Sequence, residues 1–258
     1  MKKLLALILI LIPLMASAEA VVFTNGSTTT VINYGSGAIL DNLTNQTYIV
    51  WATLTTLDPA SSSRFLILKG GGGVANNLAI TSTGTGTFDY SRECGATDCI
   101  ANALFSSFTG VTTNVPLCLA ATRSGVNAPK LYIKVGRSGE VHEPSAYATQ
   151  TGGSALGDDS ANSIQVGGAA GGAFGLPGSV SFAATFSEVL TPSEINSVCL
   201  NALDSYLVAG GSKQVLVSFP GRQGGTTVKD FSGMCCLPNG APAWLRVGAA
   251  AAATGWWS

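Results

Sequence analysis

The chain of 258 residues can build one substantial hydrophobic core, since 46% of its residues are hydrophobic and only 10% are charged. The low charge excludes a coiled coil, and the high hydrophobicity with a formal net charge of −1 excludes long disorder. Nucleic acid is excluded as a partner, because its phosphates call for a basic face and the chain has 13 basic against 14 acidic residues.

The N-terminus has the three parts of a secretory signal peptide. Met1–Lys3 is positively charged, Leu4–Met15 is apolar, and Ala16–Ala18 offers small residues for cleavage. A membrane anchor is the alternative, but the apolar run is shorter than the ~20 residues that span a bilayer. We therefore expect residues 1–18 to be a cleaved signal peptide, with Ala20 as the second choice of cleavage site, and the mature chain to be secreted or displayed at a cell surface. No later stretch is predicted to span a membrane.

Short β-type runs separated by glycine-rich turns follow along the chain. Their spacing of roughly 8–12 residues is typical of a sandwich or a barrel and not of an alternating α/β fold. The strands are predicted at Ala20–Phe23, Thr29–Tyr34, Thr47–Thr55, Arg64–Lys69, Asn77–Ser82, Thr85–Tyr90, Leu117–Thr122, Lys130–Val135, Ser163–Val166 and Ser179–Phe186.

One helix is predicted after the last of these strands. Thr191 can cap it, Pro192 suits its first position, and Glu194 completes a capping box. Gly210 and Gly211 end it. Its apolar positions recur at helical spacing and predict a face that packs on the sandwich: Ile195, Val198, Cys199, Leu203, Tyr206 and Leu207.

Residues 19–211 are therefore expected to form the sandwich domain. Beyond it, Gln214–Phe219 again has the character of a strand. Residues 212–258 are too few to bury a core alone, so we predict an appended β segment. This segment either completes the sandwich or is the remnant of a second copy of it.

The chain has six cysteines, an even number that predicts disulfides behind a signal peptide. Cys94 and Cys99 close a short loop and are expected to pair. Cys235 and Cys236 are neighbours, and a bridge between them would strain the peptide. We expect them to reach Cys118 and Cys199, or one of them to stay free. Zinc is the alternative, but no second cysteine pair has ligand spacing.

The turn Leu190–Ile195 reads Leu-Thr-Pro-Ser-Glu-Ile and joins the strand Ser179–Phe186 to the helix. It resembles the closing motif of laminin G-like domains of the concanavalin A-like superfamily, where Leu-Thr/Ser-x-x-Glu-Ile follows a final strand. Weaker matches precede it in the family's order, so that the resemblance covers roughly residues 30–207. They lie at Thr47–Trp51, Leu117–Ile133, Ile164–Gly168 and Phe174–Gly178. Leu117 and Cys118 depart from the family's aromatic-His pair.

This resemblance implies an all-β fold: an antiparallel two-sheet jelly-roll sandwich of the concanavalin A-like type with one short C-terminal helix. Gly224–Trp244 resembles the opening of such domains, which is why a second copy is one of the two alternatives for residues 212–258.

Glycoside hydrolases share this superfamily, so the acidic residues of the chain are compared with those that such enzymes need. Hydrolysis of a glycosidic bond needs two carboxylates at a defined separation, and the related enzymes carry them as Glu-x-Asp-x-x-Glu on one strand. The chain has no such spacing; Glu140 and Glu143 flank the lone His142 in a polar loop. No Gly-x-Ser-x-Gly motif accompanies this histidine. The chain is therefore predicted not to be an enzyme.

Two clusters of polar residues are candidate sites. Asp89, Tyr90 and Arg92 lie beside the Cys94–Cys99 loop, where an aromatic ring next to charges could stack on a sugar and bind its hydroxyls; a solvated hairpin end is the alternative. The resemblance implies calcium in the loop before Ile164, since laminin G-like domains often hold this ion.

Asp158, Asp159 and Asn162 are the candidate calcium ligands, because Ca²⁺ takes several oxygen ligands. A polar turn without metal is the alternative.

Three functions follow in order of preference. The first is a secreted or surface lectin-like module that binds a glycan or an extracellular protein through loops at one rim. The second is a structural component of a virion or cell surface that self-assembles, and the third is glycan hydrolysis.

Overall fold

The computed structural model describes residues 21–23, 31–35, 40–59, 63–71, 74–82, 84–169, 174–200 and 214–218. The predicted signal peptide and all of residues 212–258 except 214–218 lie outside this part of the chain, so both remain predictions. The described part is all-β except for one α-helix and a short 3-10 helix at Phe105–Ser107.

The strands are β1 (Val21–Phe23), β2 (Ile32–Gly35), β3 (Asn45–Leu54), β4 (Arg64–Gly71), β5 (Val74–Thr81), β6 (Thr87–Arg92), β7 (Cys99–Leu104), β8 (Pro116–Ser124), β9 (Lys130–Val135), β10 (Thr149–Thr151), β11 (Ile164–Val166), β12 (Gly178–Phe186) and β13 (Gln214–Ser218). The helix is α1 (Pro192–Leu200).

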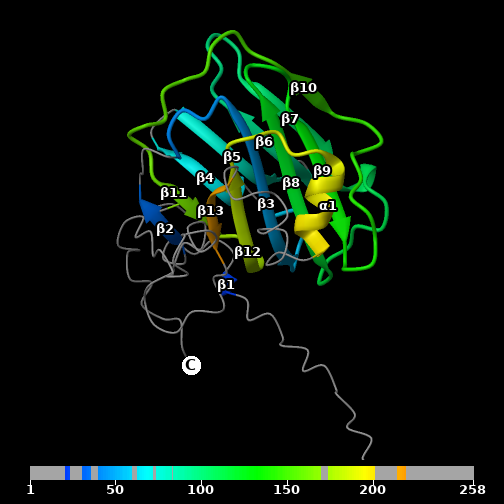
Figure 1. Ribbon diagram of the computed structural model, residues 1–258. Coiled ribbons are helices and arrows are strands. Elements are labelled where there is room, and N and C mark those ends of the chain that lie inside the picture. The colour runs from blue at the N-terminus through cyan, green and yellow to red at the C-terminus, as the bar shows by residue number, and fades with distance from the viewer. Residues whose placement is uncertain are drawn as a thin grey trace, which may run out of the picture.

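The strands form two antiparallel sheets, as predicted (Figure 1). One has six strands in the order β1-β12-β3-β8-β9, with β13 also paired to β12. The other has seven in the order β10-β7-β6-β5-β4-β11-β2. Strands β1 and β13 take successive stretches of the same β12 edge, pairing at Val180 and Ala183 respectively. The segment 214–218 thus extends the six-stranded sheet.

The main hydrophobic core lies between the two sheets and follows the period-2 alternation of the strands. On β3, Tyr48, Val50 and Leu54 point inward and are fully buried. On β5, Leu78 and Ile80 meet them from the seven-stranded sheet. Alternation therefore places the residues between these positions on the outer faces of the sandwich.

A second hydrophobic cluster covers the outer face of the six-stranded sheet. Ile49 and Trp51 of β3 point outward into it, and α1 supplies Ile195, Val198 and Cys199. Figure 1 shows α1 lying against this sheet near β8 and β9. The predicted packing face of the helix is confirmed as far as Leu200, the last residue of the helix that the structure describes.

The predicted capping box at the start of α1 is confirmed. The Thr191 amide donates to Glu194 Oε2 at 2.8 Å, and the Glu194 amide donates to Thr191 Oγ1 at 3.3 Å. Two otherwise unpaired amides at the N-terminus of the helix are satisfied in this way. None of the described helices is long and apolar enough to cross a membrane.

The disulfides confirm one prediction and correct another. Cys94 pairs with Cys99, as expected. Cys118 pairs with Cys199, so the expectation that Cys235 and Cys236 reach these two residues is wrong. The reason is the docking of α1, which places Cys199 directly over the outward-facing Cys118 of β8. Two disulfides in one domain are typical of oxidising compartments.

Candidate functional site

The tyrosine and arginine expected to bind a ligand at the rim are buried instead. Tyr90 is 1% exposed and points into the core. Its hydroxyl accepts from Arg123 Nε at 2.8 Å and lies 3.1 Å from Asn76 Oδ1 and 3.2 Å from Gln46 Oε1. A ring held in this way has no open face for a sugar, which corrects the predicted stacking role of Tyr90.

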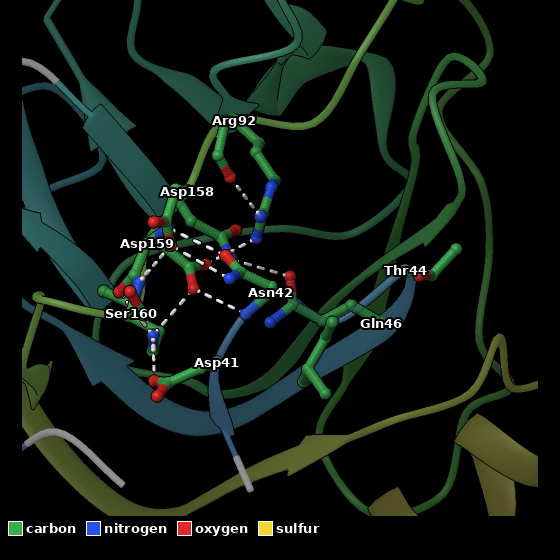
Figure 2. Close-up of polar contacts among 12 residues, drawn as sticks. Asp41, Asn42, Thr44, Gln46, Arg92, Asp158, Asp159 and Ser160 are labelled. Atoms are coloured by element: carbon green, nitrogen blue, oxygen red, sulfur yellow. Dashed lines mark hydrogen bonds and ion pairs between the residues drawn. The ribbon is translucent and has the colours of Figure 1, made fainter. Parts of the chain in front are cut away.

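Arg92 belongs to a cluster of four charges, three of which are buried while Asp41 is partly exposed. Its Nη1 lies 2.6 Å from Asp159 Oδ2 (Figure 2). Lys69 Nζ lies 2.8 Å from Asp159 Oδ1. Lys69 also lies 2.8 Å from Asp41 Oδ1. The side chains of Lys69, Arg92 and Asp159 are at most 1% exposed, so these charges neutralise one another away from water. Arg92 therefore holds Asp159 and does not present itself to a ligand, a second correction.

The same cluster contains Asp159, one of the predicted calcium ligands. Burial acts to raise the pKa of Asp159, but the Asn42 amide, Lys69 and Arg92 outweigh burial and hold this pKa below its ordinary value. Both carboxylate oxygens are thus already neutralised by cations of the protein. The Asp158 carboxylate instead accepts from the Asn42 side chain, 2.9 Å away, and from the Ser160 amide, 3.0 Å away.

Asp158 and Asp159 are therefore both engaged by groups of the protein itself. The backbone amide of Asn162 donates a hydrogen bond to the backbone carbonyl of Asp159, 3.0 Å away. Within the described ranges, no group of three His, Cys, Asp or Glu side chains could hold a metal ion. A divalent cation on Asp159 would be repelled by Lys69 and Arg92. A calcium site at Asp158 and Asn162 stays a prediction.

Asp89 behaves differently from its neighbours, because alternation along β6 turns it to the outer face while Phe88 and Tyr90 face the core. Directly opposite residues of antiparallel strands share a face. The register therefore sets Asp89 in a row across the outer face, which we call the outer row. Its members are Phe65 of β4, Ala79 of β5, Asp89 of β6, Asn102 of β7 and Thr149 of β10.

The outer row begins with an aromatic pair. The rings of Phe65 and Phe174 have centroids 5.6 Å apart, and both residues are partly exposed. Phe65 is outside the core cluster because a register shift between Phe65 and Ile67 turns it away while Leu66 and Ile67 stay inside. A partly exposed phenylalanine pair is an apolar platform at one end of the outer row.

The centre of the outer row is a carboxylate-amide pair. The Asn102 side chain donates to Asp89 Oδ1, and Thr87 Oγ1 donates to Asp89 Oδ2 at 3.1 Å. Burial raises the pKa of Asp89, and hydrogen bonds from Thr81 and Thr87 offset part of that rise. Asp89 is 9% exposed and so sits recessed in the face. The pair offers fixed acceptors and donors side by side.

A parallel row lies next to the outer row on the same face. Asn77 Nδ2 donates to Ser91 Oγ at 3.0 Å, and Ser91 is paired across the sheet with Ile100. Gln165 and Leu68 continue this row toward β2. Among the described residues that the register places in the two rows, Asp89 is the one carboxylate. This face could not be predicted from the sequence, because it depends on pairing among strands that are distant along the chain.

The residues that flank the lone histidine take no part in this face. His142 pairs its backbone with Ile133 of β9, and Glu143 forms an ion pair with Lys130, 3.0 Å long and solvent-exposed. Exposed pairs of this kind contribute little to stability. Their place in a polar loop agrees with the prediction.

No protein family and no curated protein sequence matches the chain. Among solved structures, the enzymatically active domain of tailspike protein 2 of bacteriophage CBA120 is 14% identical, with a TM-score of 0.48, over 69% of this chain and 27% of that one. The CBM40 domain of the Ruminococcus gnavus IT-sialidase, bound to α2,3-sialyllactose, is 14% identical, with a TM-score of 0.43, over 70% and 96%.

A SAP-like pentraxin of Limulus polyphemus is 12% identical, with a TM-score of 0.46, over 70% of this chain and 82% of that one. The chain spans less than a third of the tailspike chains, 27% and 30%. These neighbours are members of the concanavalin A-like superfamily. This chain has the all-β sandwich of two antiparallel sheets with one short helix that its sequence predicts.

Proposed function

We propose that the chain is a non-catalytic, lectin-like recognition module that binds a neutral oligosaccharide on the outer face of the seven-stranded sheet. The observation that carries this proposal is the outer row, which contains the partly exposed Phe65–Phe174 pair at one end and the Asp89–Asn102 pair further along the same face. An apolar surface with a few fixed polar groups is the usual composition of a small-molecule site.

Each part of the outer row suits one part of a sugar. The C–H face of a pyranose is apolar and can lie on an aromatic ring such as Phe65. Its hydroxyls both donate and accept, so they match the carboxylate of Asp89, which only accepts, and the amide of Asn102, which does both. Thr87 already holds one oxygen of Asp89 and fixes the orientation of the carboxylate.

The length of the outer row indicates the size of the ligand. Phe65 and Asn102 are separated by three strand-to-strand steps, which makes about 14 Å at the usual spacing of antiparallel strands. This distance is longer than one sugar ring. The row therefore suits a short oligosaccharide that runs across the strands, with one unit on Phe65 and another at the Asp89–Asn102 pair.

The charge of the face indicates the class of glycan. Asp89 is the one carboxylate of the two described rows, and no lysine or arginine is among the residues paired in the outer row. An ionised carboxylate repels the acidic groups of sialylated or sulfated chains, so we expect neutral glycans to be preferred. A single carboxylate also supports a binding role, since glycoside hydrolysis uses two.

Export is part of the proposal. The two disulfides, together with the predicted signal peptide, favour a secreted or surface-displayed module that meets glycans outside the cell.

A glycan array, read with and without EDTA, tests the proposed function. We expect binding to neutral oligosaccharides and none to sialylated or sulfated ones. EDTA should have no effect, since Asp158 and Asp159 are already engaged by groups of the protein itself. Failure to bind any glycan in either condition would contradict the proposal, and release of sugar from a bound ligand would contradict its non-catalytic part.

A further inference from the structure

The ammonium of Lys69 and the carboxylate of Asp159 are close enough to react with each other. We propose that the two side chains condense into an intramolecular amide, which joins strand β4 to the loop that precedes β11. This modification site is independent of the outer row, which lies on the opposite face of the same sheet.

The two reacting groups lie in contact and are buried away from solvent. Lys69 Nζ lies 2.8 Å from Asp159 Oδ1 and 2.7 Å from the Asp159 carbonyl oxygen, and both residues are 0% exposed. The backbone fixes their approach, because Ile164 of β11 pairs directly with Lys69 of β4. Oriented reactants of this kind react as though at very high concentration, with effective molarities of roughly 10⁵ M or more.

Two further charged groups are placed to assist the reaction. Asp41 Oδ1 lies 2.8 Å from Lys69 Nζ and can take a proton from the ammonium. Arg92 Nη1 lies 2.6 Å from Asp159 Oδ2, on the oxygen that Lys69 does not contact. It can hold the negative charge that develops on this oxygen when the amine attacks. Figure 2 shows Asp41 and Arg92 on different sides of Asp159.

The step balances without any further reagent. Asp41 removes one proton from the Lys69 ammonium, and the neutral amine forms a bond to Cγ of Asp159. The bond from Cγ to one carboxylate oxygen then breaks. That oxygen leaves as water after taking the proton held by Asp41 and a second proton from the former amine. The product is a secondary amide, and Asp41 returns to its carboxylate.

Burial favours the product. An ion pair removed from water loses much of its Coulomb energy to desolvation, whereas an amide is neutral. Formation of the amide leaves Asp41 and Arg92 as one anion and one cation, so the cluster stays neutral overall. The water that is released passes from the core to solvent.

Tryptic mapping of the purified, unfolded and reduced protein tests the cross-link. Trypsin cuts after a free Lys69 and gives fragments 65–69 and 70–92. If Lys69 is an amide, this cut is lost, and fragment 65–92 appears joined to fragment 138–213, which contains Asp159. The joined species is expected at the sum of the two masses less one water, and fragmentation should place the bond between residues 69 and 159.

Lys134 is an internal control in the same digest. It is also 0% exposed, but its ammonium donates to Asn196 Oδ1 at 3.1 Å and to the Gly139 carbonyl, which are not carboxylates. Trypsin should therefore cut after Lys134 in full. The Asp41→Asn variant, which keeps Lys69 and Asp159, should restore the cut after Lys69 while both disulfides and the β-sheet circular dichroism persist.

Complete cleavage of the unchanged protein after Lys69 would overturn the proposal. A cross-link that survives in Asp41→Asn would overturn the role of Asp41 as the proton relay. A loss of one water that maps inside fragment 138–213 alone would also count against the bond, because a cyclised aspartate has the same mass change without joining the two fragments.

Discussion

At the scale of single residues, the alternation of β6 separates two roles that the sequence placed together. Asp89, Tyr90 and Arg92 look like one cluster along the chain, but Asp89 faces outward while Tyr90 and Arg92 face the core. Period-2 alternation could have predicted this division. The burial of Arg92 could not be predicted, because its partner Asp159 is 67 positions away.

The raised pKa of Asp89 predicts the direction in which the stability of the fold changes with pH. Burial raises this pKa above the value of about 3.9 expected in the unfolded chain, so the folded state binds this proton more tightly. The stability that protonation contributes is full below the unfolded value and is lost as the pH rises through the folded one. The Asp89→Asn variant cannot ionise. Its free energy of unfolding, relative to wild type, should therefore rise between about pH 3.5 and pH 7 in urea titrations.

Asp158→Asn is the matched control, with the opposite sign. Hydrogen bonds from Ser160 and Asn42 lower the pKa of Asp158 to about 2. Its stabilising effect is present above the unfolded value and is lost as the pH falls toward the folded one. The variant should lose stability relative to wild type as the pH rises from about 2 to about 4. If the free energy of unfolding of Asp89→Asn, relative to wild type, does not change with pH, burial does not raise the pKa of Asp89.

Arg123 supports the core at the same scale. It is 1% exposed and donates to the Tyr90 hydroxyl and to the carbonyls of Leu43 and Thr44, at 2.8, 2.6 and 2.9 Å. Arg123→Met removes the donor from all three acceptors, of which the Thr44 carbonyl keeps the Gly125 amide and the Tyr90 hydroxyl keeps its contact with Asn76. The expected cost is about 1–3 kcal/mol for an acceptor that is left dry and unpaired, such as the Leu43 carbonyl. Chemical denaturation measures this loss, and Arg137→Met, at an exposed residue, should change stability little. Equal stability of the two variants would contradict the role given to Arg123.

At the scale of elements, most strands could be predicted from β-branched and aromatic runs. The run predicted at Thr47–Thr55 is β3, Asn45–Leu54. Strand β7 was missed, because Cys99–Leu104 contains alanine and asparagine and has little strand propensity. Its place in the sheet comes from pairing with β6. Asn102 of the outer row lies on this strand, so half of the candidate polar pair could not be predicted locally.

The two disulfides should differ in what they contribute. Cys118–Cys199 closes a loop with a sequence separation of 81, and Cys94–Cys99 one of 5. In the chain-entropy account, the longer loop stabilises the fold by about 2 kcal/mol more. Urea unfolding of the Cys118→Ser/Cys199→Ser and Cys94→Ser/Cys99→Ser double variants compares them, and a smaller loss from the first pair would contradict this ranking.

At the scale of the whole molecule, the sandwich gives its two outer faces different uses. The six-stranded sheet is covered by α1 and a second hydrophobic cluster, which the capping motif and the spacing of apolar residues allowed the sequence to predict. The seven-stranded sheet instead carries the polar outer row. Self-assembly, the alternative role expected from the low charge, stays a prediction that light scattering of the mature chain can test.

Calorimetric titration with the best glycan from the array measures whether the outer row binds a neutral oligosaccharide. Phe65→Ala and Asp89→Asn should each weaken binding by about tenfold or more, equivalent to about 1.4 kcal/mol, because each removes one end of the contact. Asp158→Asn, a carboxylate variant away from the outer row, should bind as wild type does. Equal affinity of all four proteins would contradict the claim.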